Sequence, residues 1–206
     1  MSLSVTSNTV GWSLLFSGIV FILSFIFLAL MFSTRKGAWG PLNDVTYVIA
    51  LLLIVPFLIG FSYDPESSNP MAAIIAVAPG ITGIVMIAVT QMRLVFKTIE
   101  FELNLRQGAF GSGLLGAGFI LIHLINLNMA IIPAGLNWLG LMSGFLMAMG
   151  IPTGLFYGKE ELEMTTGKLD WKKTSKLAIA VVLATFIGQI GLITWVFMLG
   201  IGIING

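Results

Sequence analysis

The chain contains no cysteine and only one histidine among its 206 residues. Without cysteine there is no disulfide, no thiol nucleophile and no thiolate ligand for zinc or an iron–sulfur cluster. A single histidine cannot supply the ligand sets of the common zinc sites, and a bis-histidine haem within one chain is excluded. The sequence therefore predicts no metal site and lacks the usual parts of nucleophilic catalysis.

Charge is equally scarce. Only 9% of the residues are charged and 57% are hydrophobic, with a mean hydropathy of +1.02. Soluble domains carry about 25% charged residues, so the composition indicates an integral membrane protein. The net charge of +1 and the lack of a basic, aromatic-rich patch argue against nucleic acid as a partner.

Six apolar segments are present, and each is long enough for the ~20 helical residues that cross a hydrocarbon layer. Because backbone groups must satisfy their own hydrogen bonds in lipid, these segments should be α-helices. We expect an all-α, polytopic six-transmembrane-helix bundle that forms a single transmembrane domain over residues 1–206. The expected spans are residues 11–32, 45–63, 71–92, 110–132, 137–157 and 177–203.

The basic residues predict the topology. All ten lysines and arginines fall in the connections 33–44, 93–109 and 158–176, which lie on one side of a six-span bundle. The positive-inside rule makes that side cytoplasmic and both termini extracytoplasmic. No basic residue precedes the first apolar run, which is too long for the core of a signal peptide, so we expect a retained span. A multi-pass protein of the cell (plasma or inner) membrane is predicted.

Residues 91–108 allow two interpretations. A helix would extend the third span into the cytoplasm and would pair Glu102 with Arg106 one turn apart. Strict alternation of apolar and polar residues over 98–106 is instead typical of a strand. Its partner would lie in 162–171, which alternates around Thr166-Gly167 like a hairpin. We favour the helix, and a small cytoplasmic cap remains the alternative.

Prolines and small residues shape the expected helices. Pro56, Pro79 and Pro152 should interrupt the second, third and fifth spans because each removes a backbone donor. Asp44 is placed to cap the second helix. Glycines at spacings of about four residues in the third, fourth and fifth spans predict close helix crossings.

Few polar side chains fall inside the spans. The ones singled out as candidates are Gln91, His123, Asn126, Asn128, Thr185 and Gln189. At 1.5 Å per residue, His123 lies ~20 Å from the inner start of its span and Gln189 ~18 Å from that of its own. Similar depth would let the two share a hydrogen bond or a polar cavity. The candidate ligand-binding residues are therefore His123, Asn126, Gln189 and Thr185.

His123 has three interpretations. A neutral imidazole bonded to a neighbouring helix is the structural one. A place in a ligand or proton path is the second, because ionisable groups inside membranes are often functional. Ligation of a tetrapyrrole metal, with a methionine as the other axial ligand, is a minor third.

The predicted function is non-enzymatic. We expect a lipid-binding or small-ligand-binding protein, or an accessory subunit of a membrane complex. The alternative is a small transporter or channel for a neutral or apolar solute, with its site near His123. A membrane-embedded enzyme ranks third, because no carboxylate or lysine lies deep in a span. Membrane lipids, other membrane subunits or a second copy of the chain are the expected partners.

Overall fold

The structure is a computed structural model that describes residues 7–34, 38–63, 70–156, 164–165, 168–169 and 176–206. Six helical segments in this part of the chain are long and apolar enough to span a membrane. They are Asn8–Thr34, Trp39–Ser62, Pro70–Val95, Leu103–Asn128, Ala134–Leu155 and Ile179–Asn205. The prediction of an all-helical chain with six candidate spans is confirmed.

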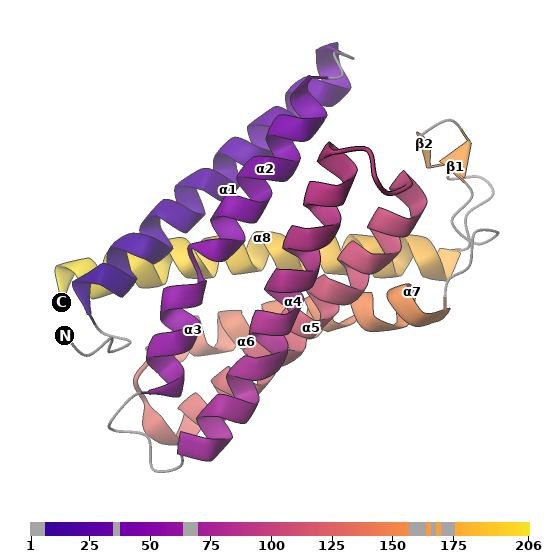
Figure 1. The fold of residues 1–206 in the computed structure, drawn as a ribbon. Coiled ribbons are helices and arrows are strands. Elements are labelled where there is room, and N and C mark those ends of the chain that lie inside the picture. Colours follow the sequence, from indigo (N-terminus) through magenta and orange to yellow (C-terminus); the bar gives the residue numbers. More distant parts are fainter. Residues whose placement is uncertain (1–6, 35–37, 64–69, 157–163, 166–167, 170–175) are drawn as a thin grey trace.

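The second and fifth spans each consist of two helices (Figure 1). The helices are α1 (Asn8–Thr34), α2 (Trp39–Leu52), α3 (Val55–Ser62), α4 (Pro70–Val95), α5 (Phe101–Met129), α6 (Ala134–Ala148), α7 (Gly150–Phe156) and α8 (Lys176–Asn205). Two short strands, β1 (Met164–Thr165) and β2 (Lys168–Leu169), pair antiparallel between α7 and α8.

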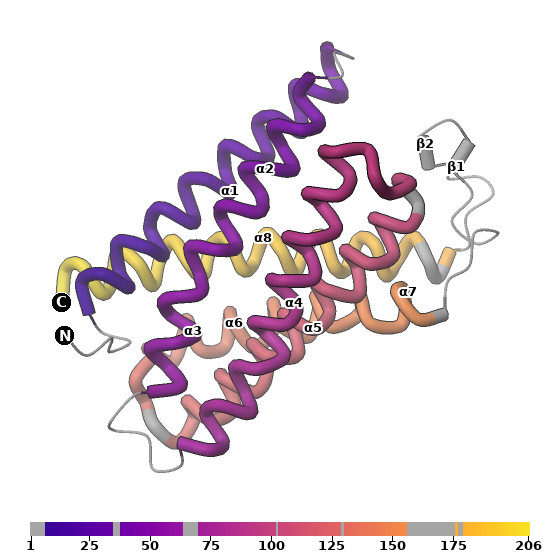
Figure 2. The backbone as a smooth tube through the Cα atoms, in the orientation of Figure 1, coloured from indigo at the N-terminus to yellow at the C-terminus, as the bar shows by residue number. Residues whose placement is uncertain are grey.

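The helices pack in two groups, which are connected by α8 and by the contacts of α2 and α3 with α4. In one group α1 packs along α2, and in the other α5 packs between α4 and α6, while α8 contacts both α1 and α6. The start of α1 and the end of α8 lie side by side (Figure 2). We call the opposite end of the bundle the basic end, because α4 finishes there and α5 and α8 begin there. Described basic residues at this end are Arg93, Lys97, Arg106 and Lys176.

The break between α2 and α3 occurs just before Pro56, as predicted. The amides around the break bond three residues back instead of four, which leaves the carbonyls of Ala50 and Leu53 without helical donors. Serines of α1 replace those donors, because Ser17 donates to Ala50 at 2.7 Å and Ser13 to Leu53 at 2.6 Å. The two carbonyls at the break therefore accept hydrogen bonds from the neighbouring helix and do not depend on water.

Other expectations about helix boundaries differ from the structure. The fifth span is interrupted near Pro152, between α6 and α7, but α4 runs through Pro79 without a break. A proline removes only one bond of the helical ladder, and the long helix on both sides tolerates that loss. Asp44 caps nothing, because α2 starts at Trp39, five residues before it.

A tight turn separates α4 from α5. Lys97 has a φ of 57°. Its backbone amide donates to the carbonyl of Leu94, and the amide of Thr98 donates to the carbonyl of Arg93. This Schellman motif ends α4. Residues 101–109 therefore begin α5 instead of extending the previous helix, and the strand interpretation of 98–106 is wrong.

The predicted hairpin in the fifth connection is confirmed over its described residues. Met164 pairs with Leu169, and Thr165 pairs with Lys168. Its turn at Thr166-Gly167 and the side chain of Glu102 lie outside the described residues. The expected pair between Glu102 and Arg106 therefore remains a prediction.

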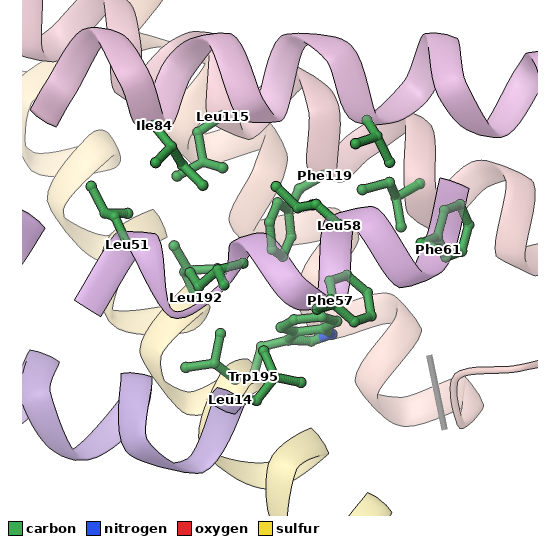
Figure 3. Packing of buried hydrophobic residues seen from close by; sticks show 14 of the residues in the cluster. Leu14, Leu51, Phe57, Leu58, Phe61, Ile84, Leu115, Phe119, Leu192 and Trp195 are labelled. Carbon is green, nitrogen blue, oxygen red and sulfur yellow. The ribbon is translucent and has the colours of Figure 1, made fainter. Parts of the chain in front are cut away.

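The core is centred on Trp195 of α8, which is fully buried. Its indole meets the rings of Phe57 and Phe119 edge-on, each with ring centroids 5.0 Å away (Figure 3). Such T-shaped contacts are favourable because the positive edge of one ring faces the negative face of the other. Helices α3, α5 and α8 therefore meet at one aromatic cluster.

Glycines let α5 approach its neighbours closely. A Cβ at Gly118 would lie 2.6 Å from the backbone nitrogen of Gly80 in α4, and one at Gly116 would lie 2.7 Å from that of Ala148 in α6. Only glycine fits such backbone-to-backbone crossings, which rely on van der Waals packing. These crossings fix the rotation of α5, and hence where its polar side chains point.

Candidate functional site

His123 lies on α5 and is fully buried. Its Nδ1 is 2.7 Å from Oδ1 of Asn137 on α6. The side-chain amide of Asn137 in turn donates to the backbone carbonyl of His123 at 3.1 Å. These two reciprocal bonds join α5 to α6 inside the bundle.

Asn126, one turn further along α5, completes this cluster. Its Nδ2 donates to Oδ1 of Asn137 at 2.9 Å and to the carbonyl of Ile132 at 3.1 Å. Its Oδ1 accepts the amide of Ile132 at 2.9 Å. Asn126 therefore satisfies the backbone of the connection between the two helices, a structural role in a medium that offers no competing water.

The bonding pattern defines the state of the imidazole. Because Oδ1 of Asn137 is an acceptor, Nδ1 of His123 carries the hydrogen and Nε2 carries the lone pair. Nε2 is buried, has no hydrogen-bond partner among the described residues, and lies against Gly140, where a Cβ would collide with it. A tetrapyrrole metal does not fit here, because the nitrogen that would bind the metal faces the backbone of α6.

Asn137 was missed by the sequence reasoning, although a signal for it exists. The short connection at 133–135 predicts that the two spans form an antiparallel hairpin. In the structure the connection is residues 130–133, and residues at equal distances from its centre face each other, which pairs Asn126 with Asn137 and His123 with Gly140. The structure brings together both of these pairs.

Gln189 and Thr185 lie elsewhere. Gln189 donates to the hydroxyl of Ser112 at 3.4 Å, and Ser112 is eleven residues, about 16 Å, before His123 on α5. The expected shared depth was wrong because α5 begins at Phe101, nine residues earlier than the predicted span. His123 and Asn126 therefore belong to one cluster, and Gln189 and Thr185 belong to another.

The second cluster lines a pocket of about 310 Å³ at the basic end. Its walls come from α1, α2, α4, α5, α7 and α8. The lining residues are Ser24, Phe25, Leu28, Asn43, Tyr47, Ile87, Gln91, Asn104, Leu105, Gly108, Ala109, Ser112, Thr153, Val182, Thr185, Phe186 and Gln189. None of these described side chains is acidic or basic, so the pocket is polar but uncharged.

Two carboxamides give the pocket unused hydrogen-bonding capacity. Asn104 is only 5% exposed, and its Oδ1 is buried without a hydrogen-bond partner among the described residues. Oε1 of Gln91, on α4, is also buried and unpartnered within the described part of the chain. Buried acceptors of this kind are costly when they stay unmatched.

Other polar groups of the pocket are held in place by the protein. Ser24 of α1 donates to Oδ1 of Asn43 on α2 at 2.8 Å. The hydroxyl of Thr185 donates to the carbonyl of Val181 within α8 at 2.9 Å. These bonds fix the walls of the pocket, whereas the buried oxygens of Asn104 and Gln91 have no hydrogen-bond partner among the described residues.

One wall of the pocket is apolar and aromatic. Phe25 of α1 and Phe186 of α8 meet edge-to-face, with ring centroids 5.6 Å apart. Phe186 is 41% exposed, so this wall reaches the outer surface of the helix bundle. The pocket thus combines amide and hydroxyl groups with an apolar side that faces outward.

The sequence reasoning found Gln189, Thr185 and Gln91 as polar groups in spans, but it assigned Asn43 and Asn104 to connections. Both asparagines fall within helices, because α2 and α5 start earlier than their apolar runs. Polar residues in the first turns of long helices were the available signal.

No family model, curated protein or solved structure matches the chain.

Proposed function

We propose that this chain is a membrane-embedded binding protein for a neutral, amphipathic molecule, which it holds in the pocket at its basic end. The single observation that carries the proposal is the buried carboxamide oxygen of Asn104, a residue of the pocket wall, which has no hydrogen-bond partner among the described residues. Leaving an acceptor unmatched in an apolar interior costs about 1–3 kcal/mol. A bound molecule that donates to this oxygen recovers that free energy.

The size and charge of the pocket support a small neutral ligand. Small-molecule sites are typically about 300–1,000 Å³, and the pocket volume of about 310 Å³ lies at the lower limit. An ion inside a membrane protein needs an opposite charge or a dedicated set of ligands. The described lining residues provide hydroxyls and carboxamides instead.

The proposed orientation places the basic end in the cytoplasm and both termini outside, in a plasma-type membrane. The distribution of lysine and arginine supports this orientation through the positive-inside rule. Membrane lipids are the proposed partners of the exposed apolar side chains of α8, such as Ile187, Ile190 and Met198. Association with a second copy or with a larger membrane complex is the alternative, and native mass spectrometry of gently purified protein distinguishes the two.

The lack of natural cysteine gives a direct test of pocket occupancy. Ala109→Cys places one thiol in the pocket wall, and Val196→Cys places one in the closed core as a control. In phosphatidylcholine nanodiscs we expect N-ethylmaleimide to modify the pocket thiol and not the core thiol. Monodecanoylglycerol or its dimethyl ether should slow that modification several-fold. If neither amphiphile protects the pocket thiol, the proposed binding function is wrong.

A transporter for a neutral solute is the second candidate. The break before Pro56, bonded by Ser13 and Ser17, supports it, because discontinuous helices line sites in many transporters. Transport requires the core around Trp195 to open toward the other side. The thiol of Val196→Cys would then become reactive in the presence of the solute, which a binding protein without alternating access does not show.

An enzymatic function ranks third. His123 is the only histidine, and its free Nε2 faces Gly140 rather than the pocket. The pocket itself contains hydroxyls and amides but no general base among its described lining residues. Loss of His123 should therefore affect the stability of the bundle rather than the occupancy of the pocket.

A further inference from the structure

The two buried amide oxygens of the pocket residues that lack a partner within the described part of the chain come from neighbouring helices. Gln91 lies near the end of α4, and Asn104 lies in the first turn of α5. Both line the same pocket. A hydroxyl group suits a carboxamide particularly well, because it donates to the amide oxygen and also accepts from the amide nitrogen.

Charged ligands are a poor match for these walls. A bound ammonium group would call for a carboxylate, and a phosphate or carboxylate for arginine or lysine. The described lining residues include neither kind. Arg106, which follows Asn104 on α5, directs its guanidinium to the carbonyl of Gly154 at 3.4 Å and is not part of the lining.

The apolar wall provides room for a hydrocarbon chain. Phe25 and Leu28 of α1 and Val182 and Phe186 of α8 line this part of the pocket. The rings of Phe25 and Phe186 meet edge-to-face there. The exposure of Phe186 places this wall at the surface that contacts lipid in a membrane. A chain bound there continues into the bilayer while its headgroup stays inside the bundle.

On the basis of the proposed binding function, we infer that the ligand is a neutral lipid with a hydroxylated, glycerol-like headgroup. Its hydroxyls donate to Asn104 and Gln91, and its chain leaves between α1 and α8 past Phe186. A pocket of about 310 Å³ has space for on the order of ten water molecules, which is ample for a glycerol group and the first part of a chain.

The test compares two amphiphiles that differ in two hydrogen-bond donors and in the two methyl groups that replace the hydroxyl hydrogens. Monodecanoylglycerol has two free hydroxyls, and its dimethyl ether has none. Protection of Ala109→Cys from N-ethylmaleimide is titrated with each, in phosphatidylcholine nanodiscs whose headgroups lack donors. Loss of two hydrogen bonds should weaken the ether by about tenfold. Glycerol alone, which lacks the chain, should not protect at millimolar concentration.

Variants connect the preference to the named residues. Asn104→Leu and Gln91→Leu should each reduce the preference for the diol, and the two together should remove it, while the ether still protects. Asn128→Leu on the same helix is the matched control, because Asn128 is exposed and is not part of the lining. It should leave the tenfold preference intact.

The outcomes separate this inference from the proposed function. Equal protection by diol and ether would overturn the hydroxylated headgroup and leave the binding function standing. Protection by glycerol as strong as that by the diol would overturn the lipid and indicate a free polyol. A preference that survives both Asn104→Leu and Gln91→Leu would overturn their assignment as the recognising groups.

Discussion

The imidazole Nδ1 of His123 and the amide Oδ1 of Asn137 lie 2.7 Å apart across the hairpin of α5 and α6. This pair, together with Asn126, closes a buried polar cluster in which nearly every donor and acceptor has a partner. The most titratable side chain of the spans therefore serves to join two helices. The pocket proposed to bind a ligand lies elsewhere, among described residues that carry no charge.

Asn137→Leu should destabilise the protein by about 2–3 kcal/mol, because it leaves the imidazole N–H without an acceptor and removes one hydrogen bond each from the Asn126 amide and the His123 carbonyl. The free energy of unfolding in detergent, titrated with sodium dodecyl sulfate, measures this. The double variant Asn137→Leu/His123→Leu should lose less stability than the sum of the losses in the two single variants. Strict additivity would show that the pair does not act as a unit.

Gly140→Ala should destabilise the hairpin by about 1–3 kcal/mol, because its new methyl group would overlap the His123 ring in a closely packed core. Gly135→Ala is the control, since a Cβ at Gly135 meets nothing within 4 Å. Thermal unfolding of both variants in the same detergent should separate them clearly. Similar melting temperatures would contradict the close contact at Gly140.

Ala130→Gly should stabilise the protein by about 0.5–1 kcal/mol, because Ala130 ends α5 in a left-handed conformation that favours glycine. Its φ is 54°. Lys97→Gly at the end of α4 should also stabilise the protein, for the same reason. Ala134→Gly, at the right-handed start of α6, should not raise the melting temperature, and a rise there would argue against the conformational explanation.

Ser17→Ala should cost about 1–2 kcal/mol, because the buried carbonyl of Ala50 then loses its donor beside the Pro56 break. Ser33→Ala tests the specificity of this effect, since Ser33 is exposed and bonds only within α1. In a Pro56→Ala background, where the helix can restore its own ladder, the cost of Ser17→Ala should shrink. A cost that stays constant would remove the proposed link between serine and proline.

Asn104→Leu should raise the stability of the ligand-free protein by about 1 kcal/mol, because it removes an unmatched buried acceptor. The same change should weaken binding of monodecanoylglycerol. Opposite effects on stability and binding are typical of residues kept for function. Thermal unfolding with and without the amphiphile measures both, and a loss of stability without ligand would show that the amide is already satisfied.

Individual residues show why the sequence predicted the spans better than the site. Asn104 and Asn43 were assigned to connections because hydropathy marks where apolar runs begin, and helices α5 and α2 start before those runs. Gln189 was placed beside His123 by counting residues, but the long first part of α5 moves His123 away from it. Asn137 was missed because pairing residues across the hairpin requires the position of its turn, which the structure places at residues 130–133.

The sequence by itself determined that the chain is all-helical with six candidate membrane spans, because apolar length and backbone hydrogen bonding in lipid are local properties. It also predicted the break at Pro56 and the hairpin in the fifth connection from local chemistry. Only the tertiary structure decided which polar residues meet. That outcome depends on the rotation and offset of each helix, which are set by glycine contacts such as those of Gly116 and Gly118, and such contacts act between segments far apart in the chain.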